Sequence, residues 1–191
     1  MSTILRPGAG FLFMKVGTHA QESLGDIIDR KKKEIEAAGF AFWGYGGNTC
    51  HPQTMVQPFA KTYEVKGETI YLCMHEMDSR HFAVSVRADE FSEDGRQWQT
   101  IPSDINVKGS RYALVVTNLR QESFDLPLSN TRVAVGNSQG RRGDDYVSGR
   151  VDKACLELTD IPTPQSTGRT IHIDLVAELK SPYAVYVRNR S

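Results

Sequence analysis

The residues best suited to bind a ligand lie close together in residues 40–59, FAFWGYGGNTCHPQTMVQPF. Trp43 and Tyr45 offer flat faces, and stacking of a nucleobase on an aromatic side chain contributes about 1–3 kcal/mol per base. Asn48 offers both a donor and an acceptor to the edge of such a ring. The stretch therefore predicts a ligand pocket, and its glycines and aromatics equally suit a tight corner of a hydrophobic core.

Cys50 and His51 give a second, catalytic interpretation of the same stretch. A nucleophilic cysteine needs a nearby cation or a helix N-terminus to lower its pKa. Because neighbours in sequence rarely have the required geometry, the fold would have to bring His19, His75 or His81 to the cysteine. A Cys/His-dependent enzyme acting on a nucleotide or nucleic acid is thus an alternative to a site without catalytic residues.

A glycine-rich loop at residues 136–150 carries Arg141 and Arg142. Arginine pairs bind phosphate through bidentate hydrogen bonds, and flanking glycines let the backbone adapt to the ligand. Asp144 and Asp145 are either hydrogen-bonding partners or counter-charges for the arginines. The alternative is a solvated surface loop. The phosphate clamp requires this loop to lie near Trp43 in space.

A metal site is the weakest candidate. His75, Glu76, Asp78 and His81 are close in sequence but do not form an H-E-x-x-H pattern. Zinc requires three or four converging ligands. We also find no phosphate-binding P-loop, no dinucleotide fingerprint and no nucleophile-elbow motif. We therefore expect no metal and no cofactor, and the thin catalytic inventory favours a binding protein over an enzyme.

Composition bounds the class of protein. The 191 residues, with 39% hydrophobic and 24% charged residues, suit one globular domain over 1–191, with residues 1–9 as a loose lead-in. The formal net charge is zero, which disfavours binding of long polyanions by bulk charge. Three widely spaced cysteines predict a reducing, cytoplasmic location. The apolar runs are too short for a membrane span, and a homo-oligomer stays open.

One early amphipathic helix is expected at about residues 23–38. Ser23 can cap its start together with Asp26, and Gly39 can end it in a left-handed conformation. The lysine run at residues 31–33 is expected on the solvated side of this helix.

Strand patterns dominate elsewhere. The stretches with β-rich or alternating composition are 10–16, 69–74, 81–86, 98–101, 112–117, 151–158, 171–179 and 184–187. The turn at Asp94-Gly95 predicts a hairpin. The expected fold class is α+β, with a strongly curled, mostly antiparallel sheet or open barrel.

The order of these features resembles PUA-like domains, the group that includes the EVE and ASCH domains. The shared points are the opening strand Phe11–Val16, the early helix, the Trp43-Gly44 corner with Asn48 beyond it, and the closing strand near Tyr112. The resemblance covers about residues 10–160 and rests on the order of elements. It implies a compact curled sheet that binds nucleic acid, often a modified or flipped base.

The leading hypothesis is a non-catalytic binding module for a nucleobase-containing ligand. Trp43 and Tyr45 would stack, Asn48 would read the ring edge, and Arg141 and Arg142 would hold phosphate. The ligand is either a free small nucleotide, which the protein would sequester, or a modified or flipped base in nucleic acid. A purely structural or protein-interaction domain is the remaining alternative.

Overall fold

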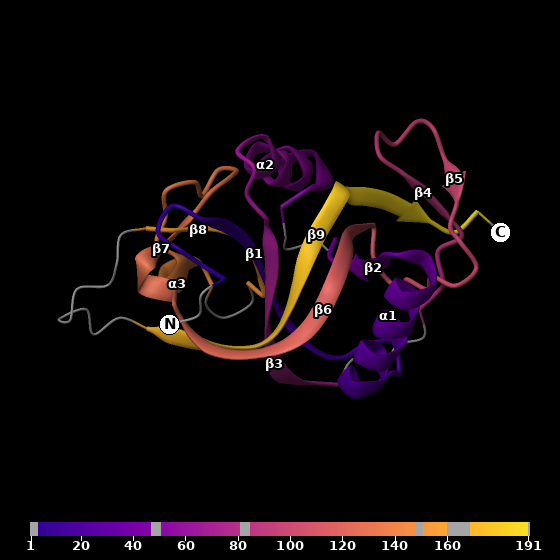
Figure 1. Ribbon diagram of the computed structural model, residues 1–191, viewed down its shortest axis with the longest axis horizontal. Helices are drawn as coiled ribbons and strands as arrows, with labels where there is room; N and C mark the ends of the chain where they lie inside the picture. The colour runs from indigo at the N-terminus through magenta and orange to yellow at the C-terminus, as the bar shows by residue number, and fades with distance from the viewer. Residues whose placement is uncertain (1–3, 47–50, 81–84, 148–150, 160–168, 191) are drawn as a thin grey trace.

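A computed structural model describes residues 4–46, 51–80, 85–147, 151–159 and 169–190 (Figure 1). Its strands and helices are β1 (Gly10–Thr18), α1 (Leu24–Ala38), β2 (Ala41–Gly44), α2 (Gln53–Val65), β3 (Tyr71–Arg80), β4 (Glu90–Ser92), β5 (Gln99–Thr100), β6 (Tyr112–Pro127), the 3-10 turn η1 (Leu128–Asn130), β7 (Thr131–Val133), α3 (Gly143–Tyr146), β8 (Lys153–Leu158) and β9 (Thr170–Arg188). The protein is a sheet-rich α+β fold, which confirms the expected class.

The nine strands in the described part of the chain belong to one sheet. Its order is β2-β6-β9-β3-β1-β8-β7, with β4 on β9 and β5 on β4. β1 and β3 are parallel, and the other strand pairs of the described chain are antiparallel. This strand order is an open path, because no pairing joins β2 to β7 among the described residues. Strong curling or an open barrel therefore stays a prediction. β6 and β9 form a long bent ribbon that crosses the molecule (Figure 1).

Helix α1 begins and ends where the sequence predicts. The Ser23 side chain accepts a hydrogen bond from the Asp26 backbone N–H at 3.2 Å. Gly39 ends the helix with a φ of 85°, a left-handed conformation that costs glycine little. The expectation for the lysine run was wrong at Lys31, which is only 4% exposed because it lies one helical turn after the buried Ile27.

The prediction of a single helix was also wrong. Residues 53–65 form α2, although Pro58 lies inside it. Proline removes one helical hydrogen bond, and the packing of a buried stripe on the sheet, which includes Val56 and Phe59, offsets this loss. Within the described residues, neither long helix has the apolar length that crossing a bilayer needs.

Several strands extend beyond their predicted ends. β6 continues from the predicted stretch 112–117 to Pro127. Its polar second half keeps pairing with β9 through several register shifts. β9 joins the two stretches predicted at 171–179 and 184–187 into one strand. Most of the strand predicted at 81–86 lies outside the described residues.

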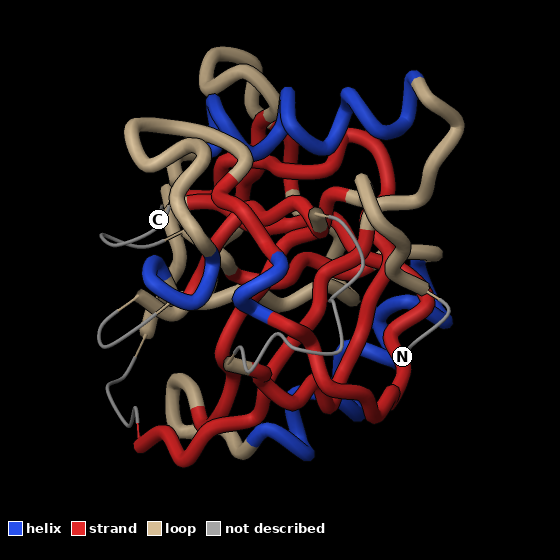
Figure 2. The backbone as a smooth tube through the Cα atoms, turned by 90° about the vertical axis from the view of Figure 1, so that its left-hand side faces the viewer, coloured by secondary structure: helices blue, strands red, loops and turns tan. Residues whose placement is uncertain are grey.

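The sheet buries both of its faces. On one face, Leu12 of β1 packs in a cluster with Ile27 of α1 and Phe59 of α2, so both long helices cover this side. The opposite face carries two further clusters, one around Phe11 near β7 and β8, and one around Phe42 beneath residues 88–107. The helices accordingly lie on the outside of the strands (Figure 2).

Candidate functional site

A pocket of about 310 Å³ opens between α1, β2, the end of β1, residues 106–110 and the start of β8. We call it the α1–β2 pocket. Its apolar wall includes Met14, Val16, Ile27 and Trp43. Pockets that bind small molecules have volumes of about 300–1,000 Å³. Of the aromatic residues singled out in the sequence, Trp43 is the one that lines this pocket.

Most of the Trp43 indole is nevertheless part of the core. The side chain is 5% exposed, and its Nε1 donates a hydrogen bond to Met14 Sδ at 3.3 Å. Only a small part of the ring therefore reaches the pocket. A substitution at Trp43 would remove core packing as well as a ligand contact, so cleaner probes of the pocket are the polar residues around it.

Tyr45 lies in the core and does not line the α1–β2 pocket. Its side chain is fully buried, and its hydroxyl lies 3.1 Å from the carbonyl oxygen of Phe13 and 3.2 Å from that of Ala154. A buried tyrosine is held in place when its hydroxyl finds such partners. Asn48, the residue expected to read the ring edge, lies outside the described residues.

The glycines of the aromatic stretch serve close packing of the chain against itself. A Cβ at Gly44 would lie 2.3 Å from Ser110 Oγ, and one at Gly46 would lie 2.3 Å from a ring carbon of Tyr112. Both distances are far below van der Waals contact, so a larger residue at either position would force its neighbour, Ser110 or Tyr112, to shift. The unusual composition of the stretch therefore has a structural explanation in addition to its place beside the pocket.

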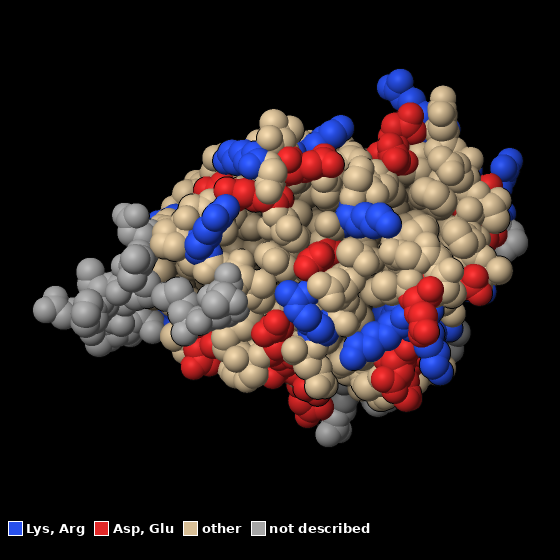
Figure 3. All heavy atoms as spheres, in the orientation of Figure 1, with Lys and Arg blue, Asp and Glu red and all other residues tan. Residues whose placement is uncertain are grey.

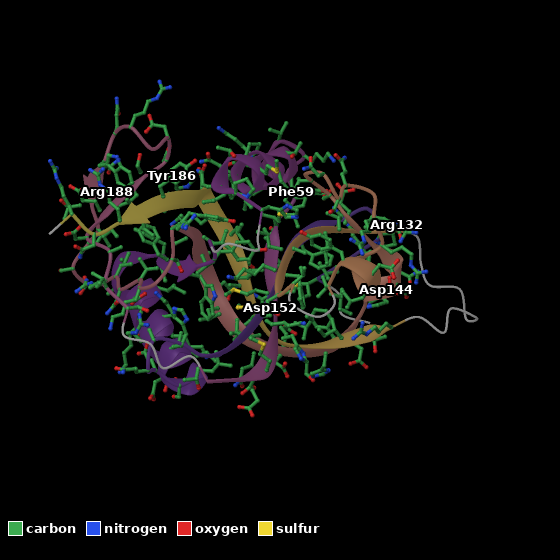
Figure 4. All side chains as sticks on the ribbon, turned by 180° about the vertical axis from the view of Figure 1, so that it is seen from behind. Phe59, Arg132, Asp144, Asp152, Tyr186 and Arg188 are labelled. Carbon is green, nitrogen blue, oxygen red and sulfur yellow. The ribbon has the colours of Figure 1, made fainter. Side chains whose placement is uncertain are left out.

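Arg141 and Arg142 do not lie in the α1–β2 pocket. Arg142 forms a 2.7 Å ion pair with Asp144, and Arg141 donates a hydrogen bond to the Asp145 carbonyl oxygen at 3.3 Å. In Figure 4, Asp144 of α3 lies near one end of the molecule, whereas Asp152, which lines the pocket, lies nearer the middle. The structure thus does not bring the arginine pair together with Trp43.

The two stretches that contain these candidates do touch, through other residues. The rings of His51 and Tyr146 stack with centroids 5.8 Å apart and an interplanar angle of 2°. A Cβ at Gly136, where φ is 79°, would lie 3.3 Å from His51 Nδ1. The contact between residues 40–59 and 136–150 is therefore an aromatic packing contact.

The described part of the chain does not offer the cysteine chemistry. His51 is 8% exposed, burial lowers its pKa, and its Nε2 has no hydrogen-bond partner among the described residues. The thiols of Cys73 and Cys155 are both buried, and burial raises the pKa of Cys73. A neutral buried thiol is inert. Cys50 lies outside the described residues.

The metal candidates are not arranged as ligands in the part of the chain that the structure describes. No group of three or more His, Cys, Asp or Glu side chains has an arrangement there that could hold a metal ion. His75 Nδ1 instead donates to the carbonyl oxygen of His172 at 2.7 Å, and Glu76 is bonded through its backbone N–H to Asp174 Oδ2 at 2.8 Å. His81 lies outside the described residues.

Basic side chains from separate parts of the chain line the α1–β2 pocket. Lys15, Lys108 and Lys153 come from β1, the loop before β6, and β8. Lys15 lies 3.6 Å from Asp152, whereas neither Lys108 nor Lys153 forms a salt bridge within the described chain. Lys108 is close enough to Glu22 to help lower the pKa of that carboxyl group. An ammonium group next to an apolar wall is suited to an anionic ligand. Sequence reasoning missed these three lysines, because nothing in their spacing shows that they converge.

A buried charged network joins α1 to the pocket wall at Asn106. Glu34 Oε1 accepts hydrogen bonds from Arg30 Nη1 at 2.8 Å and from the Asn106 backbone N–H at 3.0 Å. Lys31 Nζ donates to the Asn106 carbonyl oxygen at 2.5 Å and lies 3.1 Å from Glu34 Oε2. Arg30 is also paired with Glu22 at 2.6 Å.

The network sets the charge state of these groups. Burial lowers the pKa of Lys31 to about 8, against the opposing effect of Glu34. The hydrogen bond from Arg30 lowers the pKa of Glu22. Because Arg30 and Lys31 are held within this network, Lys108 and Lys153 are the lining cations that we expect to contact a ligand.

Comparisons of the chain with protein families, curated proteins and solved structures gave no match.

Proposed function

We propose that the protein is a binding module for a small nucleobase-containing ligand, which the α1–β2 pocket holds in a non-catalytic way. One observation carries the proposal: a pocket of about 310 Å³ is lined both by apolar side chains, which include part of Trp43, and by Lys108 and Lys153. A nucleotide has the matching division, a flat apolar base and charged phosphates. The base would lie against the apolar wall and the phosphates against the lysines.

The charge distribution favours a small ligand over a long nucleic acid. The net charge is zero. On the face in Figure 3, basic and acidic side chains are mixed, without a broad area of one sign. Proteins that bind long nucleic acids without reading the sequence use an extended basic surface. A free nucleotide, or a single flipped base, needs a smaller basic surface.

The phosphate contacts in this proposal differ from those expected from the sequence. We expect Lys108 and Lys153 to contact the phosphates instead of Arg141 and Arg142, because both arginines bind residues of α3. The PUA-like resemblance, its strongly curled sheet and a cytoplasmic location belong to the same proposal. Sequestration of a free nucleotide remains its most specific form.

The first test is a thermal-shift screen against free nucleotides, dinucleotides and short modified oligonucleotides, with the ligand recovered and weighed by mass spectrometry. A ligand at 100 times its dissociation constant stabilises the folded state by about 2.7 kcal/mol. For a chain of this size, that corresponds to an increase of about 2–5 °C in Tm. We expect a free nucleotide to give this shift and to be recovered unchanged.

The double variant Lys108→Gln/Lys153→Gln should lose the shift. Lys32→Gln/Lys33→Gln is the matched control, since it removes two exposed lysines from α1 that do not line the pocket. A shift with oligonucleotides alone would place the base in nucleic acid. Conversion of the ligand to a product would show that the protein is an enzyme. If no ligand in the screen raised the Tm, a structural or protein-interaction domain would be favoured.

A further inference from the structure

Three polar side chains on β6 and β9 form a continuous hydrogen-bonded chain. Ser123 Oγ lies 3.1 Å from His172 Nε2, and His172 Nδ1 lies 2.9 Å from Asp125 Oδ1. A carboxylate only accepts hydrogen bonds, so the His172 Nδ1 carries the proton that points to Asp125. His172 Nε2 is then left as the acceptor for the Ser123 hydroxyl proton.

The strand register explains why these residues meet. Asp125 is directly opposite His172 in the antiparallel pair of β6 and β9. Between Gln121 and Phe124, β6 contains one residue more than β9 contains opposite it. Such a bulge re-aims a side chain and is frequent beside active sites, and here the bulged segment includes Ser123.

Ser123 also lines a second pocket, of about 330 Å³, whose lining shares Val16 and Leu24 with that of the α1–β2 pocket. Its other walls combine the apolar Ile28 and Leu175 with the carboxylates of Glu76 and Asp174. The serine hydroxyl is therefore beside a hollow with an apolar wall and an acidic rim, which suits a neutral or cationic ester.

We propose that Ser123, His172 and Asp125 form an esterase-type site, separate from the nucleotide pocket. Ser123 Oγ would attack the carbonyl carbon of an ester while His172 Nε2 takes the hydroxyl proton. When the ester C–O bond breaks, the same proton passes to the departing alcohol, which leaves an acyl-serine. Water then attacks that acyl group, His172 again moves the proton, and the carboxylic acid is released.

The surrounding charges support this assignment of roles. Asp125 holds the His172 ring and would stabilise the imidazolium that forms. Asp174 Oδ1 lies 3.7 Å from His172 Nε2 and would add to that stabilisation. The His172 and Asp125 side chains are 45% and 70% exposed, and exposed pairs of this kind contribute little to folding. Substitutions of Ser123, His172 or Asp125 should therefore change the reactivity of the site without unfolding the protein.

Labelling with a fluorophosphonate probe, followed by peptide mapping, is the direct test. We expect the label on Ser123, and at least tenfold less label in Ser123→Ala and His172→Gln. Ser103→Ala, which removes another exposed serine, should label like the parent protein. Absence of label on Ser123, or equal labelling of the Ser123→Ala and parent proteins, would overturn the proposal.

Hydrolysis of p-nitrophenyl acetate and acetylcholine extends the test to turnover and charge preference. General acid–base catalysis contributes about 10²–10⁴-fold, and we expect Asp125→Asn to lower turnover at least tenfold while the protein stays folded. The cationic ester should be preferred, and Glu76→Gln should reduce that preference. Turnover unchanged in Asp125→Asn and Ser123→Ala would refute the site. The nucleotide thermal shift serves as an independent control that Ser123→Ala should leave unchanged.

Discussion

The buried network beneath the pocket wall predicts a marked asymmetry between two substitutions. Glu34 is 3% exposed and is the carboxylate partner of both Arg30 and Lys31. Glu34→Gln keeps the shape of the side chain but removes its charge. Breaking a buried ion pair by removing one partner costs about 3–5 kcal/mol, because an uncompensated charge stays behind. We expect a loss near the lower end of this range, since Arg30 keeps Glu22.

Lys31→Met should behave in the opposite way. Burial lowers the pKa of Lys31 from 10.5 to about 8. At 1.36 kcal/mol per pKa unit, folding disfavours the charged form by about 3 kcal/mol. Removing the ammonium group removes this cost, while Glu34 keeps its bonds to Arg30 and Asn106. Lys31→Met should therefore be within about 1 kcal/mol of the parent protein, or more stable.

Urea unfolding at pH 7 measures both effects. The midpoint of Glu34→Gln should fall clearly at an unchanged m-value, whereas that of Lys31→Met should stay or rise. Lys32→Met is the matched control for removing a lysine from the exposed side of α1. A large loss in Lys31→Met, or a neutral result in Glu34→Gln, would refute the electrostatic reasoning.

The pH dependence gives an independent check of the same group. Because the folded-state pKa of Lys31 lies below its unfolded value, the unfolded chain binds more protons between about pH 8 and 10.5. The stability of the parent protein should therefore rise with pH across this window relative to Lys31→Met. Burial raises the pKa values of Cys73 and Tyr63, which lowers stability at high pH. The contribution of Cys73 and Tyr63 is common to both proteins, so it cancels in the difference between their free energies of unfolding. If the pKa of Lys31 were the same in the folded and unfolded states, this difference would not change with pH.

Two further predictions concern the aromatic stretch. Gly44→Ala should destabilise the fold by about 1–3 kcal/mol, because the new Cβ would overlap Ser110 Oγ. In the double variant, Ser110→Ala should recover part of this loss. Urea unfolding of the single and double variants measures both effects, and additive changes in the free energy of unfolding would contradict the clash. Tyr45→Phe should lower the free energy of unfolding by about 1–3 kcal/mol, because it leaves the carbonyl groups of Phe13 and Ala154 without this partner. The increase in Tm caused by the nucleotide should stay the same. Loss of that increase in a folded variant would place Tyr45 in the binding site.

The sequence predicted best those elements whose signals are local. Ser23 and Gly39 define the ends of α1 by capping interactions that span only a few residues. Helix α2 was missed because Pro58 and the neighbouring glycine-rich corner are local signals against a helix. Its stability comes from packing on β9 and β1, and sequence periodicity alone does not show such distant partners.

The candidate site was predicted only in part, for a related reason. Trp43 was found because a tryptophan beside glycines is conspicuous in the sequence. Lys15, Lys108 and Lys153 are far apart in the chain, and only the fold brings them to one pocket. The same holds for Ser123 and His172, which meet because β6 and β9 pair in one particular register.

Calorimetric titration tests the central claim most directly. The nucleotide with the largest thermal shift would be titrated into the parent protein, Lys108→Gln/Lys153→Gln and the control Lys32→Gln/Lys33→Gln. Hydrogen bonds to charged groups contribute about 1.5–3 kcal/mol each, so Kd should rise at least tenfold in the pocket variant and stay unchanged in the control. The same Kd in all three proteins would contradict binding in the α1–β2 pocket.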